Sequence, residues 1–155
     1  MKQSFPYPER KKPKPSYRKP EAVKQLEELN HADRLKRFPN VPNLAYLKYR
    51  DDTANNLTKC VVKYIELLGG FASRINSTGQ YRPELKRFVY GSSKKGIADV
   101  MGTLYGKSLN IEVKIGKDKQ SEHQINVQHQ IERSGGLYYI ARNFTEFKQF
   151  IDNLN

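Results

Sequence analysis

Apolar residues recur along the chain at two spacings, and together these spacings predict a layered α/β domain. Helical spacing is found over residues 53–68, over residues 121–134, and in a closing segment marked by Phe147, Phe150, Ile151 and Leu154. Shorter apolar stretches predict strands over residues 71–76, 86–90, 97–104, 109–115 and 137–141. The order is therefore helix, strands, helix, strand, helix.

The first fifty residues follow a different pattern. Residues 21–38 are predicted to be helical, with Pro20 as a suitable start and with an irregular apolar stripe. This helix can pack on its own domain, on a second subunit or on another protein, and the sequence does not choose among these partners. The stripe consists of Val23, Leu26, Leu29, Leu35 and Phe38.

Charge also separates the N-terminal third from the rest. The 155 residues carry 28 Lys and Arg against 16 Asp and Glu, a net charge of +12, and residues 1–50 hold +8 of it. Residues 1–20 contain five of the eight prolines and a net charge of +6, so we expect a disordered arm. The basic run Arg10, Lys11 and Lys12 either follows phosphates or only keeps the protein in solution. A chain this basic indicates a polyanionic partner, above all nucleic acid.

The same sequence argues against several other classes of protein. No apolar run approaches the roughly 20 residues that cross a bilayer, and no secretory signal is recognisable. The single cysteine, Cys60, lies on the apolar stripe of a predicted helix, so we expect a core residue. One cysteine fits a reducing compartment. We therefore expect a cytoplasmic protein with no membrane partner.

The candidate chemistry gathers in a predicted hairpin over residues 97–115. Gly106-Lys107 suits a two-residue type II′ turn, which would place Asp99 opposite Lys114. Side chains alternate along a strand, so Asp99, Glu112 and Lys114 are expected on one face. The other face is almost wholly apolar and comprises Ala98, Val100, Leu104, Leu109, Ile111, Val113 and Ile115.

Two carboxylates and a lysine on one face form either an ordinary solvated sheet surface or a site. Glu112 and Lys114 interrupt an otherwise apolar strand, where charges are rare unless they are paired or bind a metal. Lysines flank the two strands and would hold a phosphate backbone: Lys94, Lys95, Lys117 and Lys119. Carboxylates that hold a divalent cation inside a basic rim are what phosphodiester cleavage needs.

At these residues the sequence resembles the PD-(D/E)XK nuclease superfamily, and most closely its VRR-NUC family. Asp99 followed by Glu112-Val113-Lys114 matches the family's acid and its (D/E)-x-K signature. Further matching segments, in the family's order, extend the resemblance over about residues 53–142: Leu68-Gly69-Gly70-Phe71, Arg74-Ile75-Asn76, Lys95-Gly96-Ile97-Ala98-Asp99 and Lys119-Gln120-Ser121-Glu122-His123-Gln124. The chain departs from the family at Ala98, where Pro is usual, and in residues 51–56, which offer Asn where many members have Glu.

The resemblance implies a restriction-endonuclease-like α/β fold over residues 51–155, preceded by the arm (1–20) and a helical extension (21–50). It implies a Mg²⁺- or Mn²⁺-dependent DNA endonuclease in which Asp99, Glu112 and the Val113 carbonyl hold the cation. Lys114 would either orient the attacking water or stabilise the transition state. The missing helix Glu argues against a second cation more than against the first.

Gln124 has two interpretations that the sequence leaves open. It matches a residue of the family's active site, and Ser121-Glu122-His123-Gln124 is also a capping box, in which the Gln reaches back to the start of its helix. Gln128 lies on the same helical face and could take the site role instead. His123 has no histidine partner at metal-ligand spacing, so we expect a surface residue.

The resemblance also implies processing of phage or mobile-element DNA, with cleavage of duplex or branched DNA, including four-way junctions, by a homodimer. A catalytically silent nuclease fold that only binds nucleic acid is the first alternative. An interaction protein built on the basic arm and the 21–38 helix is the second.

Overall fold

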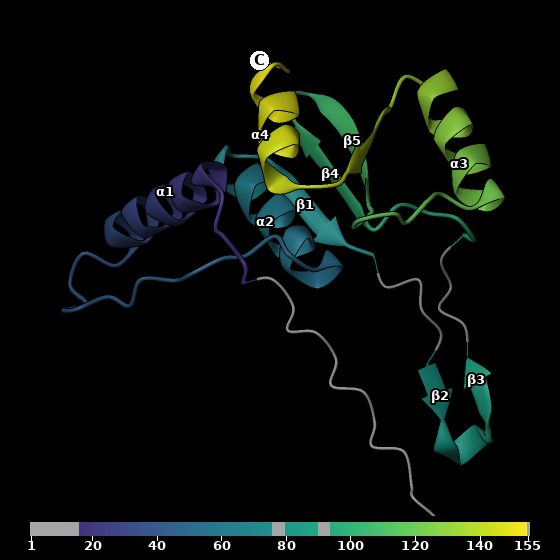
Figure 1. Ribbon diagram of the computed structural model, residues 1–155, viewed down its shortest axis with the longest axis horizontal. Coiled ribbons are helices and arrows are strands. Elements are labelled where there is room, and N and C mark those ends of the chain that lie inside the picture. The colour runs from purple at the N-terminus through teal and green to yellow at the C-terminus, as the bar shows by residue number, and fades with distance from the viewer. Residues whose placement is uncertain (1–15, 76–79, 90–93, 155) are drawn as a thin grey trace, which may run out of the picture.

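The computed structural model describes residues 16–75, 80–89 and 94–154, and its centre is a four-stranded mixed sheet (Figure 1). The strands lie in the order β1-β4-β5-β6; the β1–β4 and β4–β5 pairs are antiparallel, and β6 is parallel to β5. Their bounds are β1 Phe71–Arg74, β4 Val100–Leu104, β5 Lys107–Val113 and β6 Leu137–Ala141. The predicted α/β architecture is confirmed.

Helices cover both faces of this sheet. Helix α2 packs on β4 and β5, α4 packs on β6, and α1 packs on both of these helices. Helix α3 connects β5 to the parallel β6 and lies over the opposite face, apart from the other three (Figure 1). The bounds are α1 Glu21–Arg37, α2 Ala54–Leu67, α3 Glu122–Arg133 and α4 Phe144–Asp152. In the described part of the chain, no helix is long and apolar enough to cross a membrane.

The hydrophobic core lies between the sheet and the layer of α1, α2 and α4. The face of the β4–β5 hairpin predicted to be apolar is buried here, from Ala98 to Val113, and Ile115 is half-buried. Cys60 is fully buried in the same core, as predicted, and burial raises the pKa of its thiol to about 12. The largest fully buried side chains include Leu26, Leu57, Ile65, Ile111, Phe144 and Phe147.

The first half of α1 belongs to this core. Val23 and Leu26 are buried against the domain, whereas Leu29, Leu35 and Phe38 are 41–47% exposed. Of the three possible partners of this helix, its own domain therefore packs against the N-terminal half. The C-terminal half of the stripe remains at the surface.

Two buried carboxylates attach the N-terminal segment to the domain. The Tyr17 hydroxyl donates to Asp51 Oδ1 at 2.8 Å, and the other oxygen of Asp51 accepts from the Phe144 amide at 3.1 Å, at the start of α4. Glu27 forms an ion pair with Lys19 and is also buried. Residues 16–20 are thus part of the folded domain, whereas Arg10, Lys11 and Lys12 lie outside the described residues.

The turn of the β4–β5 hairpin differs from the prediction. The observed pairs are Leu104 with Lys107 and Val100 with Ile111, so the turn is Tyr105-Gly106 rather than Gly106-Lys107. Both turn residues have positive φ, 51° and 72°, as in a type I′ turn, whose twist matches that of paired strands. The predicted register was therefore wrong by two positions. An even shift leaves every side chain on its predicted face, because side chains alternate with a period of two.

A second hairpin is inserted between β1 and β4. It consists of β2 (Gln80–Arg82), a 3₁₀ turn (Pro83–Leu85) and β3 (Arg87–Val89). The sequence predicted a strand over 86–90 but not its partner, because residues 77–85 are polar and rich in turn formers.

Candidate active site

The Asp99 carboxylate is fixed at the end of the sheet. The chain reaches Asp99 directly before β4, and the Ile75 amide, just past β1, donates to its main-chain oxygen at 2.8 Å. The Val113 amide in β5 donates to Asp99 Oδ2 at 2.9 Å. This bond uses one carboxylate oxygen and holds the side chain beside the end of β5.

Glu112 is the most buried charged residue of the predicted site, with 1% of its surface exposed. Its Oε1 accepts from Lys114 Nζ at 3.1 Å and from Gln124 Nε2 at 2.5 Å. Its Oε2 is buried and has no hydrogen-bond partner in the described part of the chain. Burial, together with the nearby charge of Asp99, raises the pKa of this carboxyl above its usual value. The polar face of the hairpin is therefore a covered site and not a solvated sheet surface.

Gln124 has both of the roles that the sequence left open. The Ser121 side chain accepts from the Gln124 amide at 3.3 Å, and Gln124 Oε1 accepts from the Ser121 amide at 2.9 Å, which completes a capping box. The amide nitrogen of the same side chain donates to Glu112. A single carboxamide supports both roles because it has an acceptor at one atom and donors at the other. The start of α3 is thereby attached to the site.

The structure shows no hydrogen bond from Gln128 or His123 to Asp99 or Glu112 among the described residues. Gln128 accepts from Gln120 at 2.9 Å and donates to Glu132 at 2.8 Å. His123 is exposed, as predicted. Of the glutamines on this helical face, Gln124 is the one that bonds to Glu112.

Gly96 makes a close approach to α3 that no local sequence pattern indicates. It has φ +83°, and a Cβ built on it would lie 2.5 Å from the main-chain carbonyl of His123 in α3. Only glycine fits this combination of space and backbone conformation. The segment that leads to Asp99 therefore lies directly against the turn of α3 that presents Gln124.

Tyr138 is a second residue whose position the sequence did not reveal. Its neighbour in β6, Tyr139, stacks on Phe150 with ring centroids 4.1 Å apart. Tyr138 pairs with Asn110 instead, on the face that carries Glu112. Burial and the nearby Glu112 raise the pKa of its hydroxyl to about 12. Strand alternation would have indicated this face once the β5–β6 register was known.

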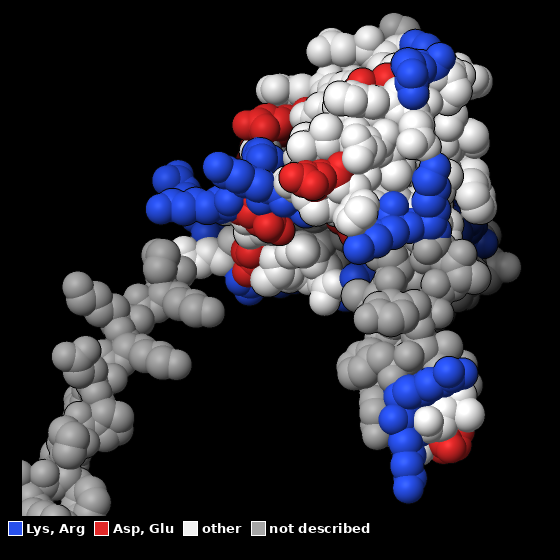
Figure 2. Space-filling model, turned by 90° about the vertical axis from the view of Figure 1, so that its right-hand side faces the viewer, with Lys and Arg blue, Asp and Glu red and all other residues white. Residues whose placement is uncertain are grey.

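The predicted basic rim is exposed around this site. Lys94, Lys95, Lys117 and Lys119 are all exposed, and Lys94 Nζ donates to Gln130 of α3 at 2.5 Å. Figure 2 shows Lys and Arg distributed over the face that carries α3, with Asp and Glu between them. The loop after Lys114 is held by Arg142, which donates to the main-chain oxygen of Asp118 at 3.2 Å.

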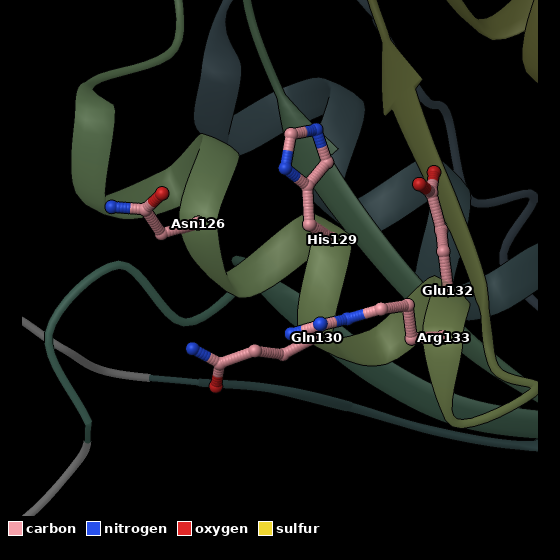
Figure 3. A pocket seen from close by; sticks show the side chains of 5 residues that line it. All are labelled: Asn126, His129, Gln130, Glu132 and Arg133. Atoms are coloured by element: carbon pink, nitrogen blue, oxygen red, sulfur yellow. The ribbon is translucent and has the colours of Figure 1, made fainter.

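A pocket of about 690 Å³ lies on the solvent face of α3 (Figure 3). Its described lining comes from that helix alone: Asn126, His129, Gln130, Glu132 and Arg133. Asp99 and Glu112 are not among these residues. This hollow is therefore separate from the candidate site.

The donor set fits one hard divalent cation. Asp99 and Glu112 supply two carboxylates, and Mg²⁺ is typically bound through one or two carboxylates together with waters and a phosphate. The unpartnered buried oxygen of Glu112 is the kind of atom that such a cation would satisfy. Among the described residues there is no group of three or more Asp, Glu, His or Cys that could hold a metal. At the start of α2, Asn55 accepts from Arg74 at 2.8 Å where many family members are expected to have Glu.

Comparisons with known proteins support a fold rather than a close relative. No protein-family model and no curated protein matches the chain. A solved structure described as a VRR_NUC domain is similar, with a TM-score of 0.50 and 18% sequence identity, over 64% of this chain and 94% of that chain. The chain therefore has the restriction-endonuclease-like fold of a VRR_NUC domain, as the sequence resemblance implied.

Proposed function

We propose that this protein is a Mg²⁺- or Mn²⁺-dependent DNA endonuclease that hydrolyses phosphodiester bonds in an active site formed by Asp99, Glu112 and Lys114. The observation that carries the proposal is the arrangement of Glu112. Two donors hold its Oε1, while its buried Oε2 has no partner among the described residues. Leaving a buried acceptor unsatisfied costs about 1–3 kcal/mol, and more for a charged group, so a structure retains such an atom where a ligand satisfies it.

The side chains have distinct parts in this reaction. Asp99, Glu112 and the Val113 carbonyl would hold the cation, which when bound offsets carboxylate–phosphate repulsion and lowers the pKa of a bound water. Lys114 Nζ lies 3.1 Å from Glu112 Oε1, at the edge of the same site. From there it can orient the attacking water or neutralise charge on the phosphate. Gln124 positions Glu112 without needing to touch substrate.

The test is plasmid nicking with titrated Mg²⁺ and Mn²⁺, comparing Glu112→Gln with Asp118→Asn. The control makes the same carboxylate-to-amide change beside the same lysine, because Asp118 Oδ2 lies 3.8 Å from Lys114 Nζ and its side chain is 65% exposed. Glu112→Gln should cut at least about 100-fold more slowly, since several kcal/mol of transition-state stabilisation depends on the cation. Asp118→Asn should cut at nearly the wild-type rate.

Two results would contradict the proposal. Equal nicking by Glu112→Gln and the wild type would remove this carboxylate from the reaction. Wild-type protein that binds DNA but cuts none with either cation would instead favour the silent nucleic-acid-binding module.

The finer part of the proposal is cleavage of branched DNA by a homodimer. One site cuts one strand, so paired cuts across a junction favour two sites related by twofold symmetry. The exposed half of the α1 stripe, Leu29, Leu35 and Phe38, supports an interface with a second copy. Light scattering and a panel of linear, nicked and four-way DNAs test this. A monomer at micromolar concentration that cuts linear and four-way DNA equally would refute it.

A further inference from the structure

The β2–β3 hairpin is inserted at the catalytic end of the sheet. The chain leaves the sheet at Ile75, whose amide bonds to the main chain of Asp99, and it returns through Lys94 and Gly96 to Asp99 itself. The return is attached to α3, because Lys94 donates to Gln130 there. Both ends of the insertion are therefore next to a proposed cation ligand.

The hairpin adds little to the packing of the domain. Its strands form a two-stranded sheet of their own, separate from the central sheet, and it projects from the body of the molecule (Figure 1). Residues 83–87, at its tip, are all exposed, and Leu85 is 51% exposed. An isolated two-stranded hairpin is marginally stable in water. Such a segment is better explained by a ligand that it contacts than by the core.

The charge of the hairpin indicates which ligand this is. Residues 80–89 contain three Lys and Arg and one Glu. The register pairs Arg82 with Arg87, so both strands of the hairpin contribute a basic residue. This excess of positive charge on a projecting hairpin favours a polyanionic ligand. Figure 2 shows Lys and Arg on the projecting hairpin, on the same side of the molecule as α3.

We infer that the β2–β3 hairpin binds the phosphate backbone of duplex DNA flanking the scissile phosphate. A two-stranded ribbon fits the major groove of B-DNA, which is about 12 Å wide, whereas a single strand offers no groove. The hairpin thereby supplies affinity for duplex next to the cut and takes no part in the chemistry. This inference rests on the proposed function for its choice of DNA as the ligand.

The experiment is the double variant Lys86→Glu/Arg87→Glu, with Lys36→Glu/Arg37→Glu as its matched control. Both change an exposed Lys-Arg pair, and the control pair lies at the end of α1, on the other side of the sheet. The hairpin variant should keep its fold, because Lys86 and Arg87 are exposed and lie outside the hydrophobic core. Affinity is measured without Mg²⁺ or Mn²⁺, for a duplex and a single strand of equal length, across a salt series.

We expect the hairpin variant to lose about tenfold or more in duplex affinity near 0.1 M salt, with a log–log salt slope flatter by about 1.8 for two lost phosphate contacts. The hairpin variant should lose less affinity for the single strand, and the control variant should lose less affinity for both DNAs. Equal losses in the two double variants, or equal losses on duplex and single strand, would overturn the inference.

Cleavage separates this inference from the proposed function. Manganese-dependent hydrolysis of bis(p-nitrophenyl) phosphate, which is too small to reach the hairpin, should be the same in the wild type and the hairpin variant. The inference alone is refuted if the wild type cuts DNA and the hairpin variant binds duplex as tightly as the wild type does. The proposed function alone is refuted if the hairpin variant selectively loses duplex binding but the wild type cuts no DNA.

Discussion

The dual role of Gln124 leads to a prediction that separates its two functions. Gln124→Leu removes the donor to Glu112 and one half of the capping box at the start of α3. Ser121→Ala removes the other half of that box and leaves the hydrogen bond from Gln124 to Glu112 in place. The two variants therefore weaken the same helix end, but only one of them changes the carboxylate.

The magnitudes follow from the hydrogen bonds that are lost. Ser121→Ala should cost about 1 kcal/mol of stability, which is typical for a lost N-cap. Gln124→Leu should cost about 2–4 kcal/mol, because a hydrogen bond to a buried carboxylate is worth about 1.5–3 kcal/mol and the capping contact is lost as well. Among the described residues, the Glu112 side chain then keeps its 3.1 Å ion pair with Lys114 alone. Partners that orient metal ligands are worth about 10- to 100-fold in activity or metal affinity, so Gln124→Leu should lose that much.

The assay combines urea unfolding with plasmid nicking over a Mg²⁺ titration. Ser121→Ala should be less stable than the wild type and should cut at a similar rate. Gln124→Leu should cut 10- to 100-fold more slowly, or need correspondingly more Mg²⁺. Wild-type cutting by Gln124→Leu at the same Mg²⁺ concentration would show that the residue only caps the helix and would refute this reasoning.

Four further predictions concern Gly96, the N-terminal segment and the protonation of Glu112. Gly96→Ala forces a Cβ against the α3 backbone at positive φ, so we expect a lower melting temperature and at least about tenfold slower nicking. Deleting residues 1–15 should flatten the log–log salt slope for duplex binding by about 0.9 per lost phosphate contact without changing the melting temperature. Deleting residues 1–20 should also cost about 1–3 kcal/mol in urea unfolding, because buried Asp51 loses a donor. Burial raises the pKa of Glu112, so the folded metal-free protein binds this proton more tightly than the unfolded chain does. The free energy of unfolding should therefore fall as the pH rises from the usual pKa of Glu through the raised pKa. Glu112→Gln should remove this part of the pH dependence of stability.

The sequence by itself determined which side chains share a face. Alternation along the two strands placed Asp99, Glu112 and Lys114 opposite an apolar surface, and this held although the predicted turn was shifted. The reason is that the period of two depends only on local backbone geometry. The helices were predicted for the same kind of reason, since their apolar spacing is a property of neighbouring residues.

Only the tertiary structure decided what covers those faces. α3 lies over the polar face, and for this reason Gln124 both caps the helix and donates a hydrogen bond to Glu112. The first half of α1, which the sequence left with three partners, packs on α2 and α4. Gly96 lies 27 residues before His123 in the sequence, and the fold brings it against the backbone of α3 at that residue. No local pattern could therefore reveal this contact. Each of these contacts joins segments whose periodicities are independent, and packing of the whole chain selects among the pairings that each segment alone allows.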